Sequence, residues 1–103
     1  MYSVEFLSKA EKDISRIIQY IRDELYNSEA AESFTDKVVK QIENLGLFPK
    51  MHAIHDTAME TEVEFRKIVI GNYLVFYFIE AESVLIAFVI HQMQEVDRVL
   101  EKF

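Results

Sequence analysis

The chain has 103 residues and a mass of 12.1 kDa, half of its residues are hydrophobic, and it contains only 2 Gly and 1 Pro. A chain of this size and composition is expected to form one domain, residues 1–103, and a disordered or repetitive protein is excluded. The absence of cysteine excludes disulfides and thiolate metal sites, and the formal net charge of −7 argues against direct nucleic-acid binding, which relies on basic surfaces.

The N-terminal residues lack the basic and long apolar regions of a signal peptide. The longest apolar runs, Tyr73–Ile79 and Val84–Ile90, are too short to cross a bilayer. We therefore expect a soluble cytoplasmic protein with no membrane contact.

The first half of the chain predicts a short strand followed by two helices. Residues 2–7 alternate apolar and polar side chains, as a half-buried strand does. Ser8 and Glu11 have the spacing of a capping box, so a helix is expected to begin at Ser8. Its apolar stripe consists of Ala10, Ile14, Ile17, Ile18, Ile21 and Leu25.

Asn27-Ser28 interrupts this pattern and offers an N-cap for the second helix. That helix is expected to end at Gly46 in the left-handed C′ position, with Leu47 packing back on Ile42. So short a connection predicts an antiparallel helical hairpin. Five residues of its stripes are expected to be buried: Ile14, Ile21, Phe34, Val38 and Ile42.

Lys50–Glu64 shows no clean period and is interpreted as a long loop. Two strands follow, at 65–70 and 73–79, and Gly71-Asn72 suits a two-residue type II′ turn between them. This turn would pair Arg66 with Tyr77, whereas a three-residue turn would place Arg66 beside Phe76.

Residues 84–90 are apolar at every position, as expected of a central strand covered on both faces. The sheet order, counted by strand number along the chain, is then 2-3-4-1, with residues 65–70 at an edge. A short amphipathic helix from Val96 to Phe103 ends the chain. The fold class is α+β, β-α-α-β-β-β-α, with the helical hairpin on one face of a four-stranded, mostly antiparallel sheet.

His52, His55 and Asp56 have a spacing that a metal ion could use on a helix. They lie in the expected loop, however, and no convincing further ligand accompanies them, so we favour a solvated loop over a metal site.

Arg66, Lys67, Tyr73, Tyr77 and His91 form the main candidate polar cluster. An Arg or Lys could hold a phosphate, and a His or Tyr could transfer a proton. The alternative is structural, because cations on an edge strand discourage edge-to-edge pairing and Tyr rings commonly pack with their hydroxyls exposed.

The order of these segments resembles the RelE/ParE superfamily of bacterial toxin–antitoxin toxins, and it is closer to ParE. The resemblance rests on the segments "SKAEKDISRIIQYI", "AAESFTDKVVKQIENLGLFP", "FRKIVIGNYLVFY" and "FVIHQMQEVDRVL", and it covers nearly the whole chain. It implies a growth-inhibiting toxin of a type II toxin–antitoxin module, of the plasmid stabilisation family, with a cognate antitoxin as partner and no cofactor or metal.

The resemblance also implies candidate site residues. Those for catalysis are Arg66, His91 and Tyr77, and those for binding are Lys67, Tyr73 and Arg98. Leu74 and Met93 stand where RelE-like ribonucleases carry arginines. We therefore expect a protein target such as DNA gyrase. The alternatives are a ribosome-dependent mRNA endoribonuclease, and a non-toxic module that keeps only antitoxin binding.

Overall fold

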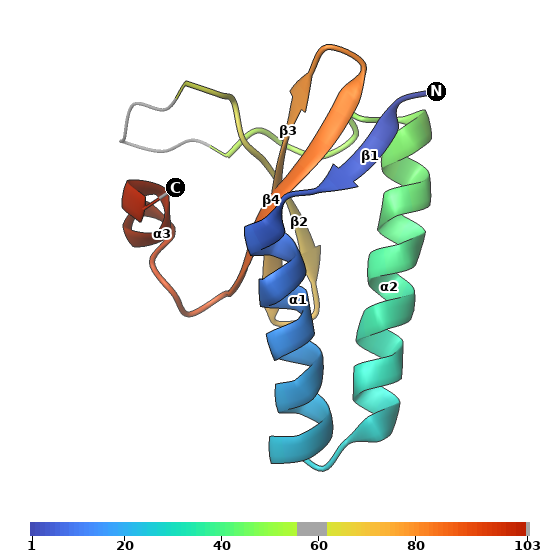
Figure 1. Ribbon diagram of the computed structural model, residues 1–103, viewed down its shortest axis with the longest axis vertical. Helices are drawn as coiled ribbons and strands as arrows, with labels where there is room; N and C mark the ends of the chain where they lie inside the picture. The colour runs from blue at the N-terminus through green and yellow to red at the C-terminus, as the bar shows by residue number, and fades with distance from the viewer. Residues whose placement is uncertain (56–61, 103) are drawn as a thin grey trace.

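The structure is a computed structural model that describes residues 1–55 and 62–102. Its elements follow the predicted order (Figure 1). They are strand β1 (Ser3–Phe6), helix α1 (Ser8–Gln19), the π-helical turn η1 (Tyr20–Glu24), helix α2 (Ser28–Leu47), strands β2 (Arg66–Ile70), β3 (Tyr73–Glu80) and β4 (Ser83–His91), and helix α3 (Val96–Lys102). The predicted α+β class is confirmed.

Helix α1 begins at Ser8 as predicted, but the capping box is wrong. Leu7 is the N-cap residue, and no side chain caps this end. The strand leads directly into the helix: the Leu7 amide still donates to the Ile86 carbonyl of β4, and the Leu7 carbonyl accepts the first helical bond from Glu11. Backbone continuity thus replaces the capping side chain.

One regular α-helix is expected as far as Leu25, and this expectation is wrong for the last turn. The Leu25 amide donates to the carbonyl of Tyr20, five residues earlier, so the last turn is π-helical.

Helix α2 is capped as predicted, because the Asn27 side chain accepts from the Ala30 amide at 3.0 Å. Its predicted end is wrong. The helix continues through Gly46 to Leu47, which is exposed rather than packed on Ile42. Gly46 lies against the start of β1 instead: its carbonyl accepts from the Tyr2 amide at 2.9 Å, and a Cβ would be in van der Waals contact with the Tyr2 carbonyl oxygen at 3.4 Å.

The sheet order is β1-β4-β3-β2, which is 2-3-4-1 read from the other edge. β1 is parallel to β4, and the other pairs are antiparallel. The predicted hairpin register is confirmed, with Arg66 opposite Tyr77. Gly71 has φ 58°, as the first position of a type II′ turn requires.

The two faces of the sheet carry separate apolar clusters. The helical hairpin covers one face, which contains Ile68, Val75 and Tyr77. Helix α3 and Val63 cover the other, which is rich in Phe. Ile21 and Phe34 are buried as expected, but Ile14, Val38 and Ile42 are only half-buried and pack at the margin of the core.

The edge of β2 is partly covered by residues 53–55. Ile54 bridges to Arg66, the His55 amide donates to the Phe65 carbonyl, and the Lys67 amide donates to the Ala53 carbonyl. Edge protection here comes from backbone pairing rather than from the cations alone. In the described part of the chain, no helix has the length and hydropathy needed to cross a membrane.

Candidate functional site: a basic cleft between α1 and α3

Two adjoining cavities lie between α1, the end of β4 and α3, and we call them together the α1–α3 cleft. Their volumes are about 500 and 270 Å³, and both are lined by Lys9, Gln94 and Val99. Further lining residues of the first are Met93, Glu95, Arg98 and Lys102, and of the second Asp13, Arg16, Ile17, Tyr73, Val89, Ile90 and His91.

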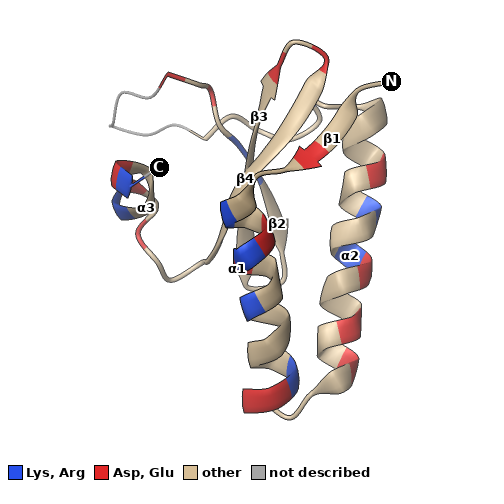
Figure 2. Cartoon of the chain, in the orientation of Figure 1, with Lys and Arg blue, Asp and Glu red and all other residues tan. Residues whose placement is uncertain are grey.

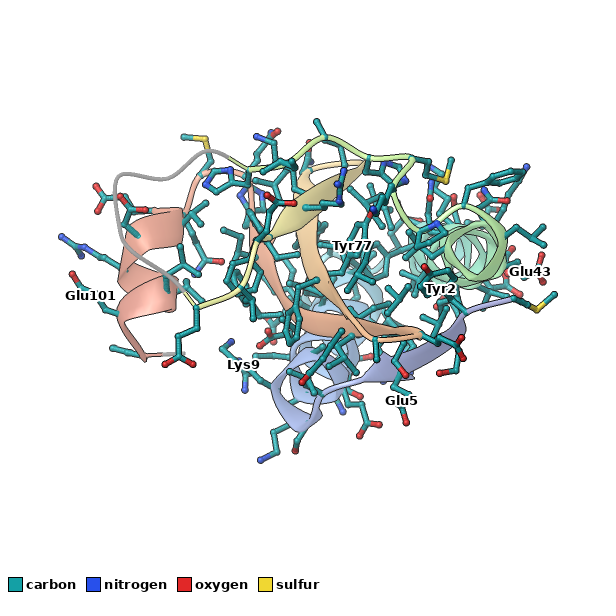
Figure 3. The ribbon with its side chains drawn as sticks, turned by 90° about the horizontal axis from the view of Figure 1, so that it is seen from above. Tyr2, Glu5, Lys9, Glu43, Tyr77 and Glu101 are labelled. Atoms are coloured by element: carbon teal, nitrogen blue, oxygen red, sulfur yellow. The ribbon has the colours of Figure 1, made fainter. Side chains whose placement is uncertain are left out.

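The cleft is basic in an acidic protein. Four of its lining residues are cations, Lys9, Arg16, Arg98 and Lys102, against two acids. Lys9 is paired with Asp13 at 2.9 Å and Arg98 with Glu95 at 3.0 Å, which leaves an excess of positive charge. Figure 2 shows basic residues along α1 and on α3, and Figure 3 shows Lys9 on the side of α1 that faces α3. The field in this cleft therefore favours a negatively charged group.

The floor of the cleft is organised by Asp13, whose residue surface is 7% exposed. β1 pairs with β4 only as far as Phe6 opposite Ile86, so the later amides of β4 need another acceptor on that side. The Asp13 carboxylate accepts from the Val89 amide at 3.0 Å and from the Lys9 ammonium at 2.9 Å. This compensates the cost of burying the carboxylate and fixes the position of Lys9.

His91 and Tyr73 form the wall at the end of β4. Their rings meet edge to face with centroids 5.3 Å apart. His91 Nδ1 accepts from the Met93 amide at 3.1 Å, so in the neutral ring the proton lies on Nε2. Burial raises the pKa of Tyr73 above its ordinary value, with a smaller contribution from Tyr20.

The predicted site residues do not gather in one place. Tyr73, His91 and Arg98 line the cleft. Arg66 and Tyr77 lie four residues further along β3 from the Tyr73–His91 pair, about 13 Å at the usual strand rise. Lys67 lies opposite Phe76, on the face of the sheet away from the hairpin, and is outside the described lining of the cleft.

Arg66 and Tyr77 hold the start of the 50–64 segment. The Arg66 guanidinium donates to the His52 carbonyl at 2.7 Å, and the Tyr77 hydroxyl donates to the Pro49 carbonyl at 2.8 Å. Tyr77 lies in the interior in Figure 3, and burial, the dominant effect, raises its pKa. A backbone hydrogen bond with His52 and the charge of Arg66 oppose that rise.

The metal interpretation of His52, His55 and Asp56 gains no support. Asp56 lies outside the described residues, and no group of three metal-ligating side chains occurs among those that are described. The His52 ring contacts the Gln41 amide oxygen at 3.2 Å and the Tyr77 ring edge to face, and burial lowers its pKa.

Sequence reasoning missed Lys9, Asp13, Arg16 and Gln94. A signal was present for Asp13, which falls between Ala10, Ile14 and Ile17 on the apolar side of the helix. An acid in an apolar stripe indicates a buried carboxylate with a partner, and Lys9 and Arg16 lie one turn before and after it.

Solved structures share this fold. A chain of the "Chromosomal ParDE TA system from P. aeruginosa" is 16% identical with a TM-score of 0.69, and the match covers 88% of this chain and 96% of that one. A chain of the "RelB-RelE antitoxin-toxin complex from Methanococcus jannaschii" is 14% identical with a TM-score of 0.50, covering 95% and 96%.

No curated protein sequence matches the chain significantly. The profile of one family does match, over residues 4–96, and that family is described as "ParE toxin of type II toxin-antitoxin system, parDE". The match spans β1 through β4 and reaches the first residue of α3. The chain therefore belongs to the ParE toxin family of type II toxin–antitoxin systems.

Proposed function

We propose that this toxin acts on a protein target such as DNA gyrase, and that a cognate antitoxin neutralises it by placing an acidic segment in the α1–α3 cleft. The observation that carries the choice of target is the state of Arg66 and Tyr77. Their polar atoms are engaged with the His52 and Pro49 carbonyls, about 13 Å of strand away from His91. Phosphodiester cleavage requires cations and a proton-transfer group that converge on one phosphate.

The antitoxin part of the proposal rests on charge and on relatives. The cleft concentrates four cations in a chain of net charge −7. Carboxylates of a partner would therefore be attracted to the cleft and repelled by the rest of the surface. Both similar solved structures come from toxin–antitoxin systems. An antitoxin segment that carries Asp or Glu therefore fits this cleft.

Induced expression tests the target, with DNA supercoiling and cleavage of ribosome-bound mRNA measured in parallel. We expect growth arrest with altered supercoiling or DNA damage, and intact mRNA. The antitoxin is tested separately: the double variant Lys9→Gln/Arg98→Gln should weaken antitoxin binding at least tenfold. The matched double variant Lys12→Gln/Lys40→Gln, outside the cleft, should not weaken it.

A ribosome-dependent endoribonuclease is the second candidate, favoured by the contents of the cleft. Lys9 and Arg16 lie in the same cavity as His91 and Tyr73, so a phosphate there would meet cations together with two groups able to give or take a proton. mRNA cleavage on translating ribosomes that is abolished by His91→Ala would establish this activity and overturn the protein-target proposal.

A further inference from the structure

The closed end of the helical hairpin extends past the sheet. In Figure 1 the end of the first helix, with the turn η1, and the start of α2 extend beyond the β2–β3 turn. A cavity of about 260 Å³ lies in the angle between this overhang and the turn, and we call it the tip pocket.

The tip pocket is largely apolar. Ile21, Leu25 and Ala30 line it from the hairpin, and Ile70 and Tyr73 line it from the sheet. Leu25 remains 54% exposed although its inner neighbours Ile21 and Phe34 are buried. The hollow and the exposed Leu25 together offer a partner apolar surface that remains in contact with water in the free protein.

The backbone at the tip is unusual in two ways. The π-helical turn η1 ends α1, and Tyr26 follows at φ 49°, in the left-handed region that bulky residues rarely adopt. Tyr26 is 90% exposed, so no core packing of its side chain explains this conformation. Both features concentrate at binding sites, where they direct side chains outward.

The surface around the tip pocket is acidic. Residues 20–37 contain five acids against two bases. Of the bases, Arg22 is already paired with Asp23 at 2.9 Å, and Lys37 lines the pocket. The acids that give this region its net negative charge include Glu24, Glu29 and Glu32. This rim attracts a basic partner and repels a second copy of the same tip.

We infer that the tip pocket is a docking surface for a basic segment of a partner protein that inserts one large apolar side chain. The pocket is smaller than the roughly 300–1,000 Å³ of small-molecule sites, but it has room for one anchoring side chain. Lys37 is the one charged residue in the described lining of the pocket, but the acids that flank the lining residues along the chain give the tip a charge opposite to that of the α1–α3 cleft, so the two surfaces select different segments. The tip surface exists whether the toxin acts on gyrase or on mRNA.

Titration with designed peptides tests the inference, observed through backbone amide NMR shifts of the full chain at low salt. The probe is a soluble helical peptide of Lys and Ala with a single Phe. We expect shifts concentrated at Ile21, Leu25, Ser33 and Gly71. Replacing the Phe by Ala, or the Lys residues by Glu, should weaken binding at least tenfold.

Variants of the protein distinguish binding in the pocket from non-specific electrostatic attraction. Ser33→Phe on exposed α2 should occlude the pocket and weaken binding about tenfold, whereas Ser15→Phe, on the exposed face of α1, should not. Glu24→Lys should weaken binding, while Glu80→Lys in the β3–β4 turn region should not. Absence of binding, shifts outside the tip, or equal affinity for the Phe and Ala peptides would overturn the inference. A wild-type dimer that Ser33→Phe dissociates would identify a second copy as the occupant and would also overturn it.

Discussion

The α1–α3 cleft and the tip pocket are built on the same helix but have opposite charge. Helix α1 gives Lys9, Asp13 and Arg16 to the cleft, and the residues after its last regular turn give Ile21 and Leu25 to the tip. Tyr73 lines both cavities. The difference shows that charge is segregated along one helical hairpin rather than averaged over the surface of a chain of net charge −7. The two proposed partners, one acidic and one basic, follow from this segregation.

The two surfaces share a structural support, and breaking it should have the largest effect. The Phe34 ring packs edge to face on Tyr73 at 5.4 Å and is 6% exposed. Phe34→Ala should lower the free energy of unfolding by about 3–5 kcal/mol, because it removes a buried ring and leaves a cavity. Urea denaturation measures this. The exposed residue Phe48 provides the control, since Phe48→Ala should change stability by about 0.5 kcal/mol or less.

A substitution at Asp13 should disrupt the α1–α3 cleft and leave the tip pocket unchanged. Asp13→Ala leaves the buried Val89 amide without its acceptor and should cost about 1–3 kcal/mol of stability. Asp13→Asn keeps an oxygen acceptor and should cost less, and Asp36→Asn on exposed α2 should be neutral. Amide hydrogen exchange should show faster exchange at Val89 in Asp13→Ala only. Equal exchange in all three variants would contradict this role of Asp13.

Arg66 and Tyr77 should belong to neither surface. Tyr77→Phe removes the hydroxyl that donates to Pro49 and should cost about 1 kcal/mol, without lowering affinity for an acidic or a basic peptide. Peptide titration of the purified variant checks this. A tenfold loss of affinity at either surface would show that the 50–55 segment reaches it.

The smallest effect concerns pH. Burial places the folded-state pKa of His52 below its ordinary value of 6.5, so the folded protein favours the neutral ring. This contribution to stability is fully present above pH 6.5 and is lost as the pH falls through the lower folded-state pKa. The free energies of unfolding of the wild type and His52→Gln, measured by urea denaturation, should therefore diverge below pH 6.5, and that of the wild type should fall more steeply as the pH is lowered. Parallel dependence of the two unfolding free energies on pH would contradict this role of His52.

Local patterns in the sequence predicted the frame of the fold well. The apolar stripes around Ile21 and Phe34, the Asn27 cap and the Gly71-Asn72 turn each depend on a few neighbouring residues, and each is confirmed. The ends of α1 and α2 depend on distant contacts. The Gly46 carbonyl, near the end of α2, is satisfied by the Tyr2 amide, and the start of α1 is fixed by the bond from Leu7 to β4 rather than by a capping box.

The candidate site was harder to predict, because it joins residues far apart in the sequence. His91 and Tyr73 were identified from the strand pattern, but Lys9 and Arg16 reach the same cleft only because α1 packs along β4 beyond the end of β1. Likewise, residue types alone could not show that the polar atoms of Arg66 and Tyr77 are engaged with backbone carbonyls.

One measurement tests the separation of the two surfaces most directly: simultaneous titration of the protein with an acidic and a basic Phe-containing peptide, followed by backbone amide shifts. We expect the acidic peptide to shift Lys9, Val89 and His91, and the basic peptide to shift Leu25, Ser33 and Gly71. Saturation with one should leave the affinity for the other unchanged within about twofold, once the free peptides are kept from pairing by moderate salt. Direct competition for one set of residues would contradict the existence of two docking surfaces.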